Sequence, residues 1–519
     1  MKRLLIIISL IAGAIVSSFA SDSPKREFRG AWLHIIGQSQ YQGKNTEQNK
    51  EYIRRQLDRL KEAGCNAVIF QVRPTADAMY ESDIEPWTAW LAGRRGKAPA
   101  TPWDPMEFTI REAHERGMEF HAWLNPYRVT SNPKEVLPID HISHRHPERF
   151  VKFNGQTFFD PAYPENRDYI CDVVADITRR YDVDAIHIDD YFYPYPANGQ
   201  KFQNDKMSYD RFGGTMPRND WRRHNVDLLI EQLHKTIRAT KPWVRFGVSP
   251  FGIWRNKASD PRGSNSSGLQ NYDDLYADVL LWADKGWVDY LAPQLYWTLD
   301  MKAAPSRHLA HWWNDHVNPK VQLYIGQDTK RTMDTPDPKA KRPNELGTKI
   351  GLSRSLPNVK GNVWWHGYWV TDNYKGVLDS LAVNYQADPA LPPAWGDASR
   401  RPAAPSGLKL ETTSDGVWLS WSPARTVPGQ PGALPAGVKP GAKVSVPAKG
   451  EDVVRYGIYI FFPDEEADID TPGTLTLLTP HSRVKVADSA EEATRLRFAV
   501  TALDRMNRES APATISIHK

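Results

Sequence analysis

Cysteine is scarce in this sequence. Cys65 and Cys171 are the two cysteines among 519 residues. Two thiols cannot supply the disulfide framework on which small secreted folds depend, so the fold has to rest on packing. We expect both to be buried free thiols.

An excess of one charge is also missing. Lys and Arg number 66 against 62 Asp and Glu, a formal net charge of +4. A nearly neutral chain offers no general attraction for nucleic acid or an anionic membrane, so we expect neither as a partner. No glycine-rich dinucleotide turn follows the first predicted strand and no phosphate loop occurs, so no cofactor is expected. His141, His144 and His146 fit a solvated loop better than a metal site.

Long hydrophobic runs are confined to the N-terminus. Residues 1–20 combine the basic start Lys2-Arg3, an apolar run from Leu4 to Val16, and small residues before a cut after Ala20. This pattern predicts a cleaved signal peptide, with an uncleaved anchor as the alternative. We therefore expect a periplasmic or secreted protein with no transmembrane segment after cleavage. We expect a polysaccharide substrate as its partner, and we expect the protein to be a monomer.

What the chain does have is a regular alternation of short apolar strands and amphipathic helices across residues 26–386. Eight strand–helix units in about 360 residues predict a (β/α)8 TIM barrel. A doubly wound open sheet is the rival, but it lacks the dinucleotide turn. The predicted strands are 28–35, 65–73, 118–127, 184–191, 245–251, 289–297, 321–328 and 361–369.

The C-terminal part has a different pattern. Residues 387–405 are rich in Pro and Ala and predict a linker. Residues 406–519 contain period-two strands and predict a small all-β sandwich, with a long loop at 425–450.

Polar and aromatic side chains share one face of the predicted strands and gather at their C-terminal ends. On the eighth strand the inward face is predicted to carry Trp364, His366 and Tyr368. Active sites of barrels lie at this end of the strands. Tryptophan and tyrosine rings suit sugar faces, and the sequence is rich in both, with 19 Trp and 21 Tyr. The predicted substrate-binding residues are Trp32, His34, Gln71, Arg73, Trp123, Asn125, Tyr127, Arg128, Tyr191, Gln294, Tyr296, Asp328 and His366.

Two adjacent carboxylates, Asp189 and Asp190, close the fourth predicted strand. Two such groups repel when both are ionised, so the pKa of one should rise, which suits a general acid at neutral pH. Cleavage of a glycosidic bond needs an acid at the leaving oxygen and a nucleophile or its substitute. We predict that Asp189 and Asp190 are the catalytic residues.

Several motifs in order resemble the bacterial glycosyl-hydrolase-like family 10. They are Phe28–Trp32, Phe70–Pro74, Asp77–Tyr80, Glu85–Trp87, His121–Arg128, Asp160–Pro161, Ile188–Pro194, Val248–Gly252 and Pro293–Trp297. The resemblance implies a TIM barrel in an envelope protein, with peptidoglycan glycan strands that lack stem peptides as the substrate class. The tail segment 500–510 is similar to fibronectin type III domains.

The Asp pair also resembles that of barrel hexosaminidases in which the acetamido group of the substrate attacks. That resemblance implies that Asp189 orients the acetamido group and Asp190 protonates the leaving oxygen. Family 18 chitinases differ, because Tyr191 stands where their acid Glu would fall.

Three hypotheses remain open. The first is a hydrolase of N-acetylhexosamine glycan, with peptidoglycan as the expected substrate. The second is a retaining glycosidase that uses Asp328 as nucleophile. The third is a glycan-binding barrel without catalysis.

Overall fold

The computed structural model describes residues 23–423, 452–463 and 465–516. The predicted leader, 1–20, and the predicted loop, 425–450, lie outside these residues. The chain divides into two compact units. One consists of Arg29–Ala113 and Glu119–Asp379, and the other contains the described parts of Met1–Phe28, His114–Met118 and Ser380–Lys519.

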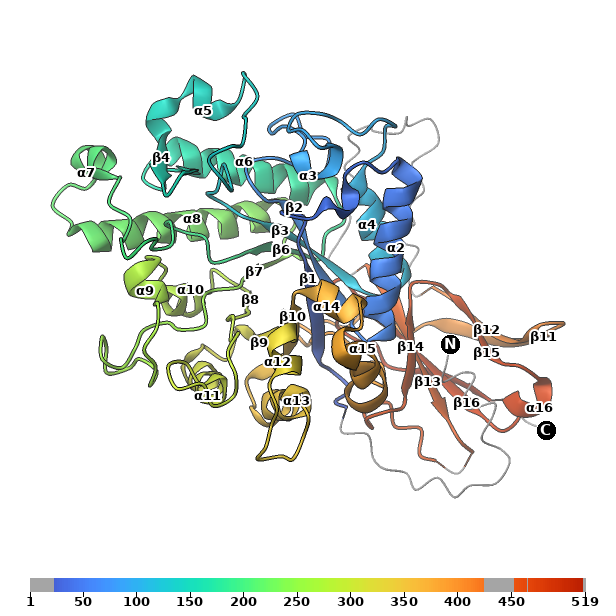
Figure 1. The fold of residues 1–519 in the computed structure, drawn as a ribbon. Helices are drawn as coiled ribbons and strands as arrows, with labels where there is room; N and C mark the ends of the chain where they lie inside the picture. The colour runs from blue at the N-terminus through green and yellow to red at the C-terminus, as the bar shows by residue number, and fades with distance from the viewer. Residues whose placement is uncertain (1–22, 424–451, 464, 517–519) are drawn as a thin grey trace. The chain divides into compact units, whose positions relative to one another are not determined.

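Eight parallel strands close into a barrel in the order β1-β10-β9-β8-β7-β6-β3-β2 (Figure 1). The predicted TIM barrel is thereby confirmed. The strands follow one another around the barrel in chain order, as (β/α)8 topology requires. Their bounds are β1 Phe28–Leu33, β2 Ala67–Arg73, β3 Glu119–Leu124, β6 Ala185–Ile188, β7 Arg245–Val248, β8 Tyr290–Leu291, β9 Gln322–Asp328 and β10 Val359–Trp365.

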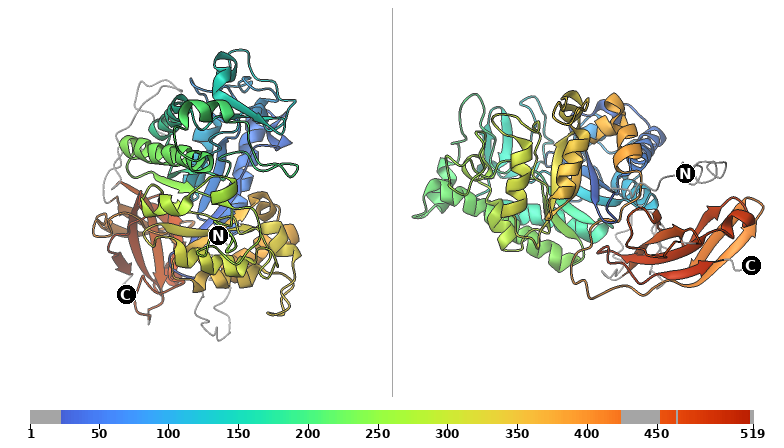
Figure 2. Two further views of the ribbon diagram at one scale, coloured as in Figure 1. Left: turned by 90° about the vertical axis from the view of Figure 1, so that its left-hand side faces the viewer. Right: turned by 90° about the horizontal axis from the view of Figure 1, so that it is seen from below.

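Helices lie around the outside of the strands (Figure 1 and Figure 2). The Asp104 carboxylate caps the start of helix α4 by accepting from the backbone N–H groups of Met106 and Glu107 at 2.9 and 3.0 Å. The main helices are α2 Thr46–Glu62, α4 Pro105–Glu115, α6 Pro164–Arg180, α8 Arg218–Thr240, α10 Val279–Asp284, α11 Ser306–His316 and α13 Leu346–Ser355.

The loops that leave the C-terminal ends of the strands carry further short elements. These loops would build the active site in a barrel enzyme. Their elements are α3 Ala89–Ala92, α5 Ile142–Arg145, β4 Phe150–Phe153, β5 Gln156–Phe159, α7 Lys206–Phe212, α9 Asn271–Asp274, α12 Thr329–Asp334 and α14 Gly367–Thr371.

The barrel interior is filled by close packing and a polar network. A methyl group at Gly247 would lie 1.9 Å from the ring carbon Cζ of Tyr290, so only glycine leaves room for that ring. The Tyr290 hydroxyl contacts Nδ1 of both His121 and His187, at 2.8 and 2.9 Å. Both histidines are fully buried, and burial lowers the pKa of each. They belong to the packed interior of the barrel.

Six of the eight predicted strands end earlier than expected. Strands β3, β6 and β8 end at Leu124, Ile188 and Leu291, so the functional side chains that follow them lie on loops. The predicted parity of the eighth strand is wrong. Trp365 rather than Trp364 shares the inward face, because Trp365 pairs with Asp328, and its ring contacts that of Trp32 on β1 at 6.5 Å.

The other unit contains an all-β domain, as predicted. Its two sheets have the strand orders β11-β12-β15 and β14-β13-β16-β17. Apolar side chains of both sheets form one core, which includes Leu419, Ile458 and Val500. The bounds are β11 Ser406–Thr413, β12 Gly416–Ser422, β13 Val453–Phe461, β14 Leu475–Thr479, β15 Arg483–Ala487, α16 Ala490–Ala493, β16 Arg497–Asp504 and β17 Ala513–Ser516.

Part of the predicted linker 387–405 is packed. Leu391 is fully buried against Tyr459 and Leu478. Its backbone exchanges hydrogen bonds with Lys25 and Glu27 at 2.8 and 3.0 Å. Among the described residues, no helix is long and apolar enough to cross a membrane.

Candidate active site

Asp189 is held in place by side chains from the neighbouring strand and loop. Trp123 on β3 donates its indole N–H to Oδ2 at 3.1 Å, and Asn125 donates to Oδ1 at 3.1 Å. Asp189 is 4% exposed, and burial raises the pKa of its carboxyl, opposed by the nearby Arg128 charge and these hydrogen bonds. The carboxyl group is therefore fixed in orientation at the top of the barrel.

Asp190 lies beside it, just after the end of β6, and is 3% exposed. Its Oδ2 accepts a hydrogen bond from the Tyr195 hydroxyl. Burial and the neighbouring Asp189 charge raise the pKa of Asp190 to about 7. This carboxyl group therefore keeps a proton to higher pH than an ordinary aspartate does.

An aromatic floor lies next to the two carboxyl groups. Tyr296 and Trp365 are stacked, with ring centroids 6.3 Å apart and planes at 6°. Trp365 also contacts Trp123 at 5.9 Å, edge to face. Burial raises the pKa of the Tyr296 hydroxyl. The nearby charges of Asp190 and Asp189 raise it further. Half-exposed stacked rings beside an acid suit the apolar face of a sugar.

Two residues of this site were missed by the sequence interpretation. Trp365 was assigned to the outer face, and only the pairing of β10 with β9, which places Trp365 beside Asp328, shows that it faces inward. Tyr195 lies beyond the predicted strand, and only the fold brings its hydroxyl to Asp190.

The predicted substrate-binding residues divide into two groups by burial. Five are partly exposed and can reach a ligand: Tyr191, Gln294, Tyr296, Asp328 and His366. Eight are buried: Trp32, His34, Gln71, Arg73, Trp123, Asn125, Tyr127 and Arg128.

Arg73 needs a correction, because it is fully buried and its guanidinium is already engaged. Its Nε and Nη2 donate to the two carboxylate oxygens of Glu85 at 2.7 and 2.6 Å. Its Nη1 donates to the backbone oxygens of Asn125 and Pro126. Arg73 therefore supports the loop that carries Asn125, and its side chain is not exposed at the site.

Gln71 and Tyr127 need the same correction. Gln71 is fully buried, and its Oε1 accepts from the backbone N–H groups of Ile35 and Ile36 at 3.0 and 3.1 Å. Tyr127 is fully buried, and burial raises the pKa of its hydroxyl. Both residues are packed into the protein, and neither reaches the surface of the site.

Trp32 lies under the floor. It is 2% exposed and donates its indole N–H to Nε2 of His187 at 3.2 Å. Because an indole N–H can only donate, Nε2 of neutral His187 is the acceptor and its Nδ1–H points to Tyr290. Trp32 thus joins the floor to the barrel interior.

A pair of histidines lies at another edge of the floor. The rings of His34 and His366 are 4.7 Å apart, and both approach Trp365. Burial, with a smaller contribution from His366, lowers the pKa of His34 to about 3. Burial also lowers the pKa of His366, so both rings are neutral at pH 7.

Arg128 and Gln294 line the site beside the acids. The Arg128 guanidinium lies over the Tyr191 ring, 4.5 Å from its centroid. Gln294 donates to the backbone oxygen of Ser249 at 2.9 Å, which fixes its amide. Asp328 has a different role in the structure, since its Oδ1 accepts the Arg331 backbone N–H at 2.8 Å and caps helix α12.

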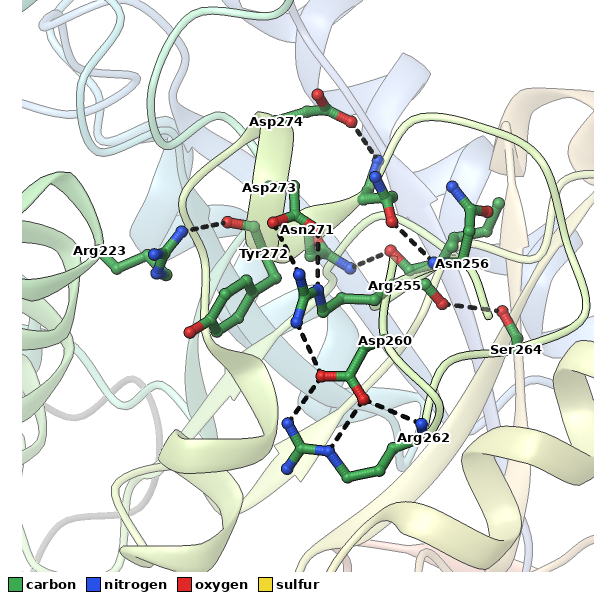
Figure 3. A network of polar contacts seen from close by, with 12 residues as sticks. Arg223, Arg255, Asn256, Asp260, Arg262, Ser264, Asn271, Tyr272, Asp273 and Asp274 are labelled. Atoms are coloured by element: carbon green, nitrogen blue, oxygen red, sulfur yellow. Dashed lines mark hydrogen bonds and ion pairs between the residues drawn. The ribbon is translucent and has the colours of Figure 1, made fainter. Parts of the chain in front are cut away.

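The loop after β7 is braced by a network of polar contacts, shown in Figure 3. Arg255 pairs with Asp260 and Asp273 at 2.7 and 2.8 Å, and Arg262 also pairs with Asp260. Asn271 clamps the start of this loop by bonding the backbone N–H and C=O of Phe251. The Phe251 ring in turn contacts that of Tyr195 at 6.3 Å.

No group of three or more His, Cys, Asp or Glu side chains is arranged to hold a metal ion within the described ranges. His141 bonds Ser143 instead, with 2.8 Å between Nδ1 and the hydroxyl oxygen. Cys65 and Cys171 are buried free thiols, as predicted.

The fold and this site define a class, a TIM barrel with adjacent aspartates among aromatic rings, as expected for a glycoside hydrolase. The glycosyl hydrolase-like 10 family model matches residues 27–342, and the chain belongs to that family. The predictions of family and enzyme class are thus confirmed at this level.

Two similar proteins share that description. Glycosyl hydrolase YngK of Bacillus subtilis is 41% identical over 428 residues, which cover 80% of this chain and 83% of that protein. Glycosyl hydrolase DigH of Escherichia coli K12 is 38% identical over 330 residues, 59% of this chain and 73% of that protein. The glycoside hydrolase domain of PgaB (BpsB) from Bordetella bronchiseptica aligns with 69% of this chain and 99% of its own, at 12% identity and a TM-score of 0.44, too low to bear on function.

Proposed function

We propose that the protein hydrolyses N-acetylhexosamine glycan, in particular the glycan strands of peptidoglycan, by substrate-assisted catalysis in the bacterial envelope. The observation that carries this proposal is the pair of buried adjacent carboxyl groups with different partners. The glycan class and the envelope follow from the family resemblance and the predicted leader.

In the proposed mechanism Asp190 is the general acid. Its pKa of about 7 leaves a proton available for the leaving glycosidic oxygen as the bond to the anomeric carbon breaks. The acetamido oxygen of the same sugar forms the new bond to that carbon, so the protein need not supply a nucleophile. Water then attacks the anomeric carbon and opens the cyclic intermediate. Asp190, now ionised, takes a proton from this water.

Asp189 is the positioning carboxylate. Trp123 and Asn125 hold it, and a carboxylate retains further lone pairs for the acetamido N–H. Its negative charge stabilises the positive charge that develops as the acetamido group attacks.

The test is digestion of purified peptidoglycan sacculi, with and without their stem peptides, followed by mass analysis of the products. Asp189→Asn and Asp190→Asn are each expected to lower kcat by about a hundred- to ten-thousandfold. Asp190→Asn should melt no lower than wild type above pH 7, because the buried, ionised Asp190 destabilises the folded protein there. Full turnover by both variants would overturn the assignment.

A substrate series separates the mechanism from the alternatives. An otherwise identical glycan without the acetamido group should resist cleavage. Its cleavage at an equal rate would favour a retaining mechanism, and binding of glycan without release of reducing ends would favour a non-catalytic barrel.

A further inference from the structure

A cavity lies in the loops at the C-terminal end of the barrel strands. It has a volume of about 620 Å³, and its lining residues are Phe153, Asn154, Ala197, Asn198, Gln200, Lys201, Gln203 and Asn204. The first two come from the β4–β5 hairpin and the rest from the segment between the Asp pair and α7. Figure 1 shows β4 and α7, the elements next to these segments, at the same side of the barrel.

The cavity is joined to the proposed catalytic centre by a short stretch of chain. Ala197 lies two residues after Tyr195, whose hydroxyl bonds Asp190, and two residues span at most about 7 Å. Phe202, from the same segment, packs against Tyr193 and Phe153, at 5.8 and 5.7 Å. The cavity wall is therefore continuous with the loop that carries the acids.

The lining has the chemistry of a site for a neutral hydroxylated chain. Five of its eight residues are carboxamides, each with both donors and acceptors, and Phe153 adds a half-exposed ring. Lys201, the one charged residue among the eight, pairs with Asp274 at 2.6 Å. That pair neutralises the cavity, so it does not favour an anion.

The wall is also held in place before any ligand binds. The Asn204 amide donates to the Lys152 backbone oxygen at 2.6 Å, and Asn198 donates to Asn154 at 3.4 Å. Asp274, the partner of Lys201, accepts from the Gln270 backbone N–H in the braced loop of Figure 3. A preformed site loses less entropy when it orders a flexible glycan.

We propose that this cavity is a distal subsite that binds sugar units of the same glycan chain beyond those at Asp189 and Asp190. The proposal rests on the proposed function for its ligand class. It predicts that affinity rises with chain length because long chains occupy both places.

The experiment measures binding of the β-1,4-linked N-acetylglucosamine dimer and hexamer by calorimetry to the full chain carrying Asp190→Asn, whose turnover is expected to be at least about a hundredfold slower than that of the wild type. The hexamer is expected to bind at least about tenfold more tightly than the dimer, about 1.4 kcal/mol. Adding Ala197→Trp, which fills the cavity, should abolish this advantage, and Gln200→Ala should reduce it. Both should leave dimer affinity unchanged.

Lys206→Ala is the matched control, since Lys206 follows the same segment but is exposed, pairs with Asp210 and does not line the cavity. It should keep the length dependence. Equal affinity for dimer and hexamer, or an undiminished advantage in cooperatively melting Ala197→Trp and Gln200→Ala proteins, would overturn the subsite. Failure of the proposed function would show differently, as intact glycan after incubation with the wild-type protein.

Discussion

At the residue scale, the two aspartates differ in the partners that surround them. Asp189 accepts from Trp123 and Asn125, whereas Asp190 has the Tyr195 hydroxyl. Their adjacency could be predicted from the sequence, but their partners could not, because Tyr195 follows a turn whose course depends on the loop.

The raised pKa of Asp190 predicts a pH dependence. The acid acts in its protonated form, so kcat should fall as pH rises through about 7. The Tyr195 hydroxyl bond lowers the pKa of Asp190, so Tyr195→Phe should raise it and move the alkaline limb of the pH–rate profile to higher pH. Movement of that limb to lower pH would contradict the role given to Asp190.

Asp328 separates the proposed mechanism from a retaining one. Asp328→Asn keeps a good cap for α12, since Asn and Asp cap helices about equally, and removes the charge alone. We expect kcat on glycan within about threefold of wild type, because the proposed mechanism takes its nucleophile from the substrate. Loss of turnover with an unchanged melting temperature, together with a trapped glycosyl-protein adduct in the wild type, would support Asp328 as nucleophile.

At the scale of elements, one buried ion pair supports the loops around the site. Arg73 on β2 and Glu85 in the loop that follows are each fully buried, and Arg73 also bonds the backbone after β3. Glu85→Gln leaves a buried guanidinium without its counter-charge and should destabilise the fold by about 3–5 kcal/mol in chemical denaturation.

The control for this prediction is the double variant Arg73→Met and Glu85→Met, which removes both charges. It should recover much of the lost stability, because apolar residues of similar size often replace a buried pair at little cost. An unchanged denaturation midpoint for Glu85→Gln would contradict a supporting role for the pair.

The positions of the strands could be predicted from the sequence better than which of their side chains face into the barrel. All eight barrel strands lie where apolar runs of the sequence predict them, because a parallel strand covered by helices needs such a run. The prediction of the inward face of β10 was wrong because the pairing of β10 with β9 shifts register between Val359 and Asn362. A one-residue slip exchanges the two faces of a strand, and the slip is set by its neighbour.

At the scale of the whole molecule, the N-terminal pattern predicts a processed envelope protein, and we expect a monomer. Expressed with its own leader, the protein should be recovered from the periplasm or medium. Its intact mass should be that of a chain that begins at Ser21. Light scattering should give the mass of one chain, below the 59.0 kDa of the full sequence. Retention of residues 1–20 in a membrane fraction would support an anchor instead, and twice that mass would exclude the monomer.

The sequence alone was sufficient for the barrel, the all-β domain and the family, because these depend on patterns repeated over hundreds of residues. It also identified the adjacent aspartates, whose chemistry is visible from their types. Only the tertiary structure decided which side chains reach the surface of the site and which, like Arg73, are buried and already bonded to other protein groups. That choice depends on partners that are distant in the chain, Glu85 for Arg73 and Asp328 for Trp365, and no local pattern encodes their meeting.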